Sequence, residues 1–208
     1  MIRPFLHTLA AMLVSLGLWQ TGQGLWIYLK ADLAQYLLEF AWSQTLKGER
    51  EVKPWPWADT WPIGRLLVPR QGIDLIVLAN ANRRTLAFGP GHESISTPPG
   101  ENGTTILSGH RDTHFRFLEF LREGDRIVIQ HPNSTITLYT IQAIDIVDAH
   151  QTTIHLNHLQ NHLVLVTCYP FDAITPGGSL RYVVTAMANK PAFDHDHVPV
   201  PPHRFSQL

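Results

Sequence analysis

The feature that most constrains the fold of this chain is a series of short apolar runs separated by turn residues. Such runs, bounded by clusters rich in Gly, Pro, Asn and Asp, are typical of β-strands. They occupy residues 65–69, 74–79, 104–110, 126–131, 135–148, 162–168 and 181–187, with 135–148 interpreted as two runs. Strands in this number and at this spacing favour a closed barrel or a sandwich. The predicted fold class is all-β, with short helices near 113–121 and 152–161.

The N-terminus has a different composition, because Arg3 precedes an apolar run from Phe5 to Trp19. A basic start followed by such a run is typical of a secretory signal, cleaved or retained. If the run continues as a helix to Leu29, it becomes long enough to cross a bilayer. We expect residues 1–29 to form a retained signal anchor with a transmembrane helix; the alternative is a buried helix of a soluble domain.

Residues 30–62 are predicted to hold an amphipathic helix and a linker. Apolar residues recur at three- and four-residue spacing between Leu25 and Leu46, and Gly48 ends the pattern. The predicted apolar face consists of Trp26, Leu29, Leu33, Leu37, Phe40 and Ala41. The stretch "EVKPWPWADTWPIG" is too rich in proline for a regular helix or a central strand, so its tryptophans are expected to pack on the domain edge. The globular domain then covers 63–188, and 189–208 form a flexible tail.

Composition excludes some functions. The formal net charge of -1 gives no electrostatic support for a nucleic-acid partner. The single cysteine, Cys168, excludes an intrachain disulfide. His155, His158 and His162 have spacings that could place them on one helix face, but no acidic or thiol ligand completes a metal site. Neither these residues nor the "DHDH" stretch at 194–197 is assigned a metal, and no cofactor is predicted.

Cys168 ends an apolar run, and two other residues could give its thiol a chemical role. A thiol needs a partner that helps it to ionise, and its attack on a carbonyl needs a group that stabilises the oxyanion. His110 follows a strand-like run and Gly109, which permits close approach. Arg181 begins a run after the turn-rich loop "YPFDAITPGG" and carries a permanent positive charge. Each residue alone is more often structural, and a lone cysteine is usually a small core residue.

Taken together, these stretches resemble the sortase family over roughly residues 60–188. "VLVTC" (164–168) is similar to the family's T-L-x-T-C signature, "SGHRDTHF" to its catalytic-histidine stretch, and Arg181 to its essential arginine. The order His, Cys, Arg also agrees, whereas Val164 departs from the signature's first threonine. "PWPWADTWPIG", "FGPGH" and the short anchored chain look most like sortases of Gram-negative proteobacteria.

The resemblance implies a closed sortase-type barrel of seven to eight strands on the outer face of the cytoplasmic (inner) membrane, held by a single N-terminal span. It implies a cysteine transpeptidase that cleaves an LPXTG-like C-terminal sorting signal of secreted proteins and passes the acyl group to an amine. Cys168 would be the nucleophile, His110 the acid and base, and Arg181 the residue that holds the substrate and the oxyanion. Thr167 is a second candidate for substrate or oxyanion contact. Asp112 is expected in a turn or helix cap, and it and His114 are secondary candidates for orienting His110.

The sequence is also compatible with two other hypotheses for the function. One is a different Cys/His acyl-transfer enzyme, such as an L,D-transpeptidase or a cysteine peptidase, although "LVTCYPF" lacks the L,D-transpeptidase context and papain-like enzymes place Cys before His. The other is a non-catalytic barrel that binds a partner and buries Cys168 in its core. The direction of the Cys168 side chain separates the enzyme from the binding module.

Overall fold

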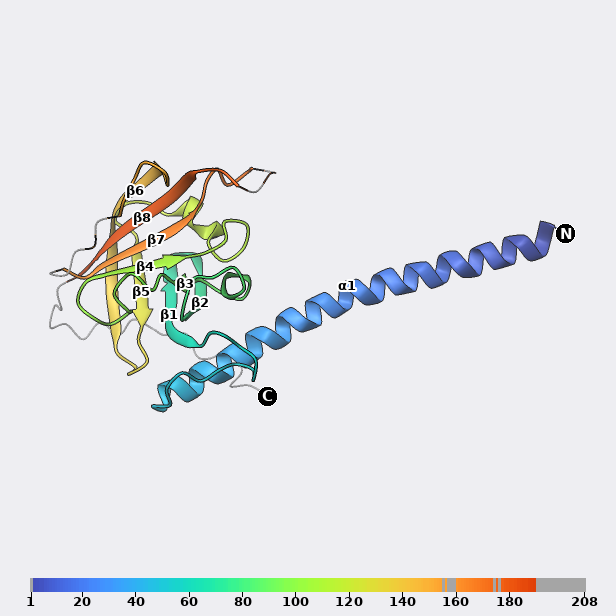
Figure 1. Cartoon of the computed structure of the whole chain (residues 1–208), viewed down its shortest axis with the longest axis horizontal. Helices are drawn as coiled ribbons and strands as arrows, with labels where there is room; N and C mark the ends of the chain where they lie inside the picture. Colours follow the sequence, from blue (N-terminus) through green and yellow to red (C-terminus); the bar gives the residue numbers. More distant parts are fainter. Residues whose placement is uncertain (1, 155, 157–159, 174, 176, 190–208) are drawn as a thin grey trace.

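The computed structural model consists of a long helix and a β-barrel, and it describes residues 2–154, 156, 160–173, 175 and 177–189 (Figure 1). Helix α1 (Ile2–Leu46) packs against the barrel with its C-terminal part and extends away from it toward the N-terminus. The strands are β1 (Pro62–Val68), β2 (Ile73–Leu78), β3 (Gly91–His92), β4 (Thr104–Ser108), β5 (Arg126–Gln130), β6 (Ile136–Asp148), β7 (His162–Cys168) and β8 (Leu180–Ala188). Short 3-10 helices are η1 (Pro69–Gln71), η2 (Thr85–Ala87) and η3 (Arg116–Phe120).

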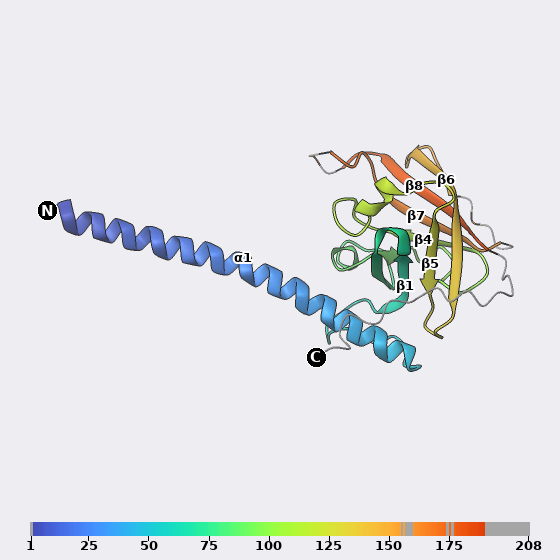
Figure 2. The same ribbon diagram turned by 180° about the vertical axis from the view of Figure 1, so that it is seen from behind.

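The described strands close into a barrel in the order β1-β2-β3-β4-β7-β8-β6-β5, which confirms the predicted closed barrel. Most neighbours are antiparallel, but β4 and β7 run parallel, and so do β2 and β3. Strands β4, β7 and β8 therefore lie side by side (Figure 2). Because β7 is parallel to β4 and antiparallel to β8, the end of β7 meets the end of β4 and the start of β8.

Four details of the predicted strands and helices were wrong or incomplete. Residues 135–148 form one strand, β6, in which a register shift between Ile141 and Ala143 accommodates the irregular pattern. The two-residue strand β3 was missed because Gly91–His92 is too short to show an alternating pattern. The helix predicted near 113–121 is the 3-10 helix η3. In the range 152–161, residues 152–154 are not helical, and residues 155 and 157–159 lie outside the described residues.

Alternating side chains divide β7 between two apolar clusters. Leu163 and Leu165 belong to the large cluster inside the barrel, together with Leu107 of β4 and Val184 of β8. Val164 and Val166, which alternate with these leucines, belong to a smaller outer cluster together with Ile106 of β4 and Val183 of β8. Ile154 and Leu156 pack against this cluster. Successive side chains of a strand point to opposite faces, so this division fixes which face each later residue of β7 presents.

Helix α1 ends as predicted, but its buried face differs from the predicted one. Gly48 has a φ of +98° and its N–H donates to the Thr45 carbonyl at 3.0 Å, a left-handed helix end that suits glycine. Leu38 and Trp42 are fully buried and pack on Ile76 and Leu78 of β2. Of the predicted face, Ala41 is buried, whereas Trp26, Leu29, Leu33 and Phe40 are all more than half exposed. The pattern failed because α1 contacts the barrel only near its C-terminal end (Figure 1).

An ion-pair group fastens α1 to the barrel beside this apolar contact. The Arg65 side chain of β1 is 6% exposed, and its Nη1 lies 3.0 Å from the Glu39 carboxylate on α1. Its Nη2 donates to the Asp74 carboxylate of β2 at 2.7 Å. A buried guanidinium is tolerated when its donors are satisfied by carboxylates in this way.

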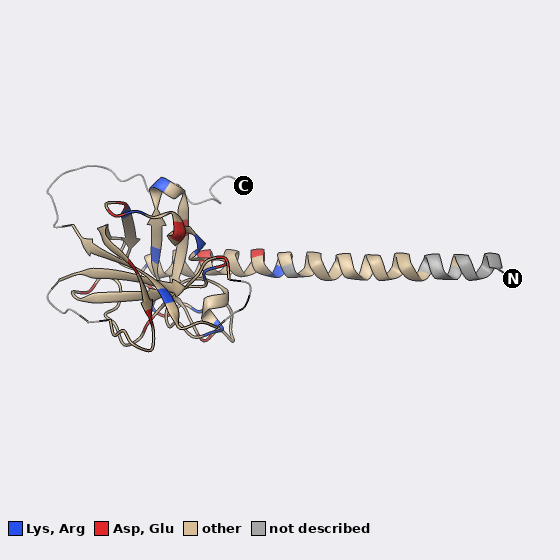
Figure 3. Cartoon of the chain, turned by 90° about the horizontal axis from the view of Figure 1, so that it is seen from above, with Lys and Arg blue, Asp and Glu red and all other residues tan. Residues whose placement is uncertain are grey.

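The part of α1 that extends away from the barrel carries no Asp, Glu, Lys or Arg between Arg3 and Lys30. Figure 3 shows a long tan stretch of this helix, without acidic or basic residues, beyond the barrel contact. Within the part of the chain that the structure describes, no helix combines the length and apolar character needed to cross a membrane. The helix runs without a break through residues 29 and 30, where the anchor was expected to end. The predicted tail, 189–208, lies outside the described residues from residue 190 onward.

Replacing Trp42 by alanine should lower the free energy of unfolding by about 3–5 kcal/mol, because the substitution leaves a cavity under α1. Trp57→Ala is the matched control, since Trp57 is 83% exposed, contrary to the predicted packing of this tryptophan. That control should change the free energy by less than about 0.5 kcal/mol. Urea unfolding followed by far-UV circular dichroism measures both. Equal effects of the two variants would contradict the docking of α1 through Trp42.

Two buried histidines make the barrel sensitive to acid. Burial lowers the pKa of His92 and of His131 below the ordinary value of 6.5. The Nε2 atom of His92 lies 3.1 Å from the Thr97 carbonyl oxygen, and that of His131 lies 2.8 Å from the Thr137 hydroxyl. Both imidazoles are therefore more readily protonated in the unfolded chain than in the folded one.

The free energy of unfolding should accordingly fall as the pH drops through about 6.5 toward the lower pKa values of the folded state. Each such histidine contributes a slope of at most about 1.4 kcal/mol per pH unit. Urea titrations between pH 7.5 and 5.5 measure this slope. His131→Gln should reduce it, whereas the same substitution at the exposed His150 should leave it unchanged. An identical slope in wild type and His131→Gln would contradict the assignment.

Candidate active site

The three residues predicted to act together lie on three adjacent strands or directly after them. Cys168 is the last residue of β7, and its register partner on β8 is Arg181. On the other side of β7, Ser108 of β4 pairs with Val166, so His110 and Cys168 each lie two residues beyond a paired position. Register partners have Cβ atoms about 4.5–5.5 Å apart and share a face of the sheet. The barrel therefore brings the three positions to one end of its wall.

All three side chains belong to the outer face of the barrel. Val164 and Val166 belong to the outer cluster, so the alternation places Cys168 on that face as well. The same alternation places His110 in line with Ile106, and Arg181 in line with Val183. Cys168 and His110 are exposed and Arg181 is partly exposed. A core position for Cys168, which the binding-module reading requires, is therefore wrong.

Gly109 allows β4 to end close to the barrel core. A Cβ atom at this position would lie 2.7 Å from Cγ of Phe115, a fully buried ring. The Phe115 N–H donates to the His110 carbonyl at 2.9 Å, so the chain turns back over Gly109 immediately after His110. The predicted need for close approach at Gly109 is confirmed, and the same turn presents His110 on the outer face.

Thr167 joins β7 to the end of β4. It is only 2% exposed, and its hydroxyl donates to the Gly109 carbonyl at 2.7 Å. The Gly109 N–H in turn donates to the Val166 carbonyl at 3.2 Å. The side chain points into the barrel, away from the face that carries Cys168. The geometry gives Thr167 a role in holding the two strands together rather than the predicted direct contact with substrate.

The secondary candidates lie in the turn after His110. Asp112 is exposed, and its carboxylate lies 3.3 Å from Nε of Arg111. This pairing occupies Asp112 with Arg111, and its place in a turn agrees with the structural alternative. His114 is partly buried, and burial together with the charge of His110 lowers its pKa. His114 is thus near His110, and it favours its neutral form.

The Arg181 guanidinium points back to the loop that precedes β8. Its Nη1 donates to the carbonyls of Gly178 at 2.7 Å and Leu180 at 2.9 Å. A carboxylate missed in the sequence lies nearby at the end of β6. Hydrogen bonds from the His150 N–H and the Ser179 hydroxyl lower the pKa of Asp148, and the charges of His150 and Arg181 act in the same direction. The two hydrogen bonds to backbone carbonyls hold Nη1 of Arg181. Its Nε and Nη2 form the other edge of the guanidinium.

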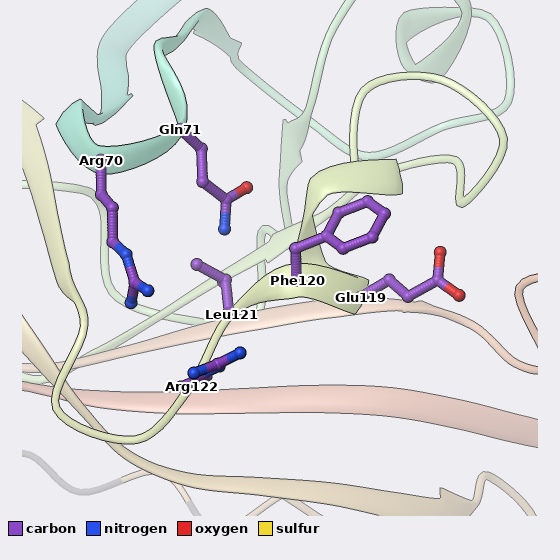
Figure 4. Close-up of a pocket in the computed structure, with 6 residues that line it drawn as sticks. All are labelled: Arg70, Gln71, Glu119, Phe120, Leu121 and Arg122. Atoms are coloured by element: carbon purple, nitrogen blue, oxygen red, sulfur yellow. The ribbon is translucent and has the colours of Figure 1, made fainter.

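Two adjoining cavities are lined partly by the segment after His110, between Thr113 and Arg122. The smaller, of about 350 Å³, is lined by Arg70, Gln71, Glu119, Phe120, Leu121 and Arg122 (Figure 4). The larger, of about 650 Å³, shares Gln71 and Phe120 with it and reaches Thr113 and His114. Neither cavity is lined by Cys168, His110 or Arg181, and the Cys168 and His110 side chains are exposed. Among the described residues no cluster of three His, Cys, Asp or Glu side chains could hold a metal ion; His155, His158 and residues 194–197 lie outside them.

Comparison with known proteins shows the same family from sequence and from structure. The sequence model of the sortase domain matches residues 66–189, more than half of the chain. Sortase D of Bacillus subtilis strain 168 is 36% identical over 122 residues, which are 58% of this chain and 61% of that protein. The chain thus matches less than two thirds of that relative's length. Since Bacillus is Gram-positive, this match does not support the expected resemblance to sortases of Gram-negative proteobacteria.

Solved structures share the fold at lower sequence identity. A Sortase D5 transpeptidase from Clostridium perfringens has a TM-score of 0.59 at 22% identity, over 76% of this chain and 99% of that one. Sortase C1 of Streptococcus agalactiae in complex with MTSET has a TM-score of 0.56 at 25% identity, over 63% and 69%. A C. perfringens sortase C with the C-terminal cell wall sorting motif has a TM-score of 0.57 at 18% identity, over 77% and 90%.

Replacing Gly109 by alanine should destabilise the barrel by about 1–3 kcal/mol, because the new methyl group overlaps the Phe115 ring. Gly178→Ala is the control near the same site, where the nearest atom to a Cβ would be 3.8 Å away. That control should change the free energy by less than about 1 kcal/mol. Urea unfolding of both variants provides the measurement, and a small effect at Gly109 would show that Phe115 is not held against it.

Proposed function

Because the chain belongs to the sortase family, we propose that it is a cysteine transpeptidase. It cleaves an LPXTG-like sorting signal near the C-terminus of a secreted protein and transfers the acyl group to an amine. The observation that carries the proposal is the pairing of Cys168 with Arg181 on the outer face, with His110 at the same end of the neighbouring strand. A nucleophile, an acid–base group and a cation then face one open surface.

In the first step the Cys168 sulfur attacks the threonine carbonyl carbon of the signal. A C–S bond forms, the C–N bond to the next residue breaks, and His110 donates its proton to the departing amine. In the second step an incoming amine attacks the thioester carbon and gives its proton to His110. A new amide bond forms, the C–S bond breaks, and Cys168 is regenerated.

Arg181 stabilises the oxyanion of both steps through the edge of its guanidinium that its loop does not hold. Its Nη1 is bound to the carbonyls of Gly178 and Leu180, so Nε and Nη2 are assigned to the substrate. A fixed cation costs little reorganisation when charge develops on the carbonyl oxygen.

The chain is also proposed to be held at the cytoplasmic (inner) membrane by its N-terminal segment, with the barrel on the extracytoplasmic side. Support comes from the apolar side chains of α1 beyond the barrel contact, such as Leu13, Leu16, Trp19 and Leu25, each more than half exposed. Within this proposal, an origin among Gram-negative proteobacteria rests on "PWPWADTWPIG" and "FGPGH" alone.

The function is tested by trapping the thioacyl enzyme on a library of LPXTG-like peptides and weighing the intact protein by mass spectrometry. Wild type should gain the acyl mass, and Cys168→Ala should not. Since Cys168 is the only cysteine, the thioester can form at no other thiol. Arg181→Lys keeps the charge but loses the fork, and it should slow adduct formation by about 10²–10³-fold. Absence of a Cys168-dependent adduct with every peptide would refute the transpeptidase function and favour another acyl-transfer substrate.

A further inference from the structure

His110 stands between two residues that are each bonded to the chain around Cys168. On one side, Gly109 exchanges hydrogen bonds with Val166 and Thr167, the residues before the cysteine. On the other side, Arg111 reaches the residues after it. Hydrogen bonds on both sides of His110 therefore connect its segment with the segment that contains Cys168.

The connection on the Arg111 side is made by a buried cation. Arg111 is 8% exposed, its Nη1 donates to the Pro170 carbonyl at 2.8 Å, and its Nη2 donates to the Ala173 carbonyl at 2.8 Å. Its Nε faces the Asp112 carboxylate at 3.3 Å. Burying a guanidinium is costly unless its donors are satisfied, so these two carbonyls are held where the fork requires them.

A second arginine strengthens the same connection. Nη1 of Arg116, on η3, donates to the Phe171 carbonyl at 3.0 Å. The Phe171 ring is buried and lies edge-on to Tyr182 of β8, with ring centroids 5.0 Å apart. The chain that leaves Cys168 is therefore fastened to the segment after His110 and to the strand that carries Arg181. Arg116 is about half exposed, so Arg111 is the better-shielded of the two contacts.

We propose that Arg111 is a positioning residue, which holds the loop after Cys168 against the segment after His110 and so fixes the thiol opposite the imidazole. The inference rests on the proposed transpeptidase function and adds a residue that touches no substrate. Its physical basis is that a catalytic pair must be held within a fraction of an ångström, and a shift of about 1 Å can cost about 10²-fold in rate. The backbone of β4 and β7 aligns the two residues only from one side.

The effect of Arg111 can be read without any substrate from the pH dependence of Cys168 alkylation by iodoacetamide. Only the thiolate reacts, so the curve reports how His110 influences the thiol. The full chain is compared with His110→Ala, Arg111→Gln, Arg111→Lys and Arg65→Gln. Arg65 is the matched control, because among the described residues it is the other buried arginine, and it lies in the contact between α1 and the barrel. The arginine variants retain the other titratable or charged residues of the surrounding segments: Glu93, Asp112, His114, Asp148 and Arg181. Of these, Asp112 loses its contact with Arg111 in Arg111→Gln, and Arg111→Lys keeps a positive charge beside it.

The alkylation curve of Arg111→Gln should move from that of wild type toward that of His110→Ala. The curve of Arg111→Lys should lie between them, because the single nitrogen of lysine keeps the charge but cannot reproduce the two donor positions of the guanidinium fork. Arg65→Gln should lower stability and leave the curve unchanged. Once a peptide that the enzyme cleaves has been identified, Arg111→Gln should lower kcat for its cleavage about 10–100-fold and change KM less than about twofold.

A wild-type curve for Arg111→Gln would overturn the inference and leave Arg111 with a structural role only. If Arg111→Gln does not fold, Arg111→Lys decides the question: a wild-type curve together with a wild-type kcat overturns it. Coincident curves for wild type and His110→Ala would show that His110 does not influence the Cys168 thiol. That result would contradict the Cys168–His110 pairing and therefore the inference. A failure of the transpeptidase function is recognised separately, as the absence of any thioacyl adduct while the alkylation curves still differ.

Discussion

The position of β7 between a parallel and an antiparallel neighbour is the constraint on which the candidate site depends. A parallel pair brings the end of β7 level with the end of β4, and an antiparallel pair brings it level with the start of β8. Three residues separated by 58 and 13 positions in the chain, His110, Cys168 and Arg181, are thereby collected at one place. Loops alone would not hold them there, because the backbone hydrogen bonds of both ladders fix the register.

The two faces of β7 contact different parts of the molecule. Inward residues such as Leu163 and Leu165 join the barrel core, and Thr167 ends this row by binding the Gly109 carbonyl inside the wall. The outward residues Val164 and Val166 belong to the outer cluster, and the same row ends at the exposed thiol of Cys168. Because the core fixes one set of positions, the other set is fixed at the same time. The position of the candidate nucleophile therefore follows from the packing of the inward residues.

Helix α1 is attached to the barrel at the side of β1 and β2. Trp42 and Leu38 provide the apolar contact, and Arg65 connects Glu39 of the helix with Asp74 of β2. Gln35 adds a hydrogen bond to the Phe88 carbonyl at 3.0 Å. The loop before β3, to which Phe88 belongs, also approaches the turn after His110, where the Leu86 backbone lies near the His114 imidazole. The helix contact and the site thus share one loop.

The sequence by itself determined the strands with a clear apolar pattern, and residues 162–168 coincide with β7. Its spacing and motifs also predicted Cys168, His110 and Arg181 as candidate site residues, because a short motif carries residue identity without any knowledge of contacts. It could not show that Thr167 turns inward, that β6 is one strand, or that α1 buries Leu38 and Trp42 instead of Leu33 and Phe40. Those outcomes depend on partners distant in the chain, and so do the bonds from Arg111 to Pro170 and Ala173. Local pattern decides which residues can form a strand or react, whereas the closure of the barrel decides which of them meet.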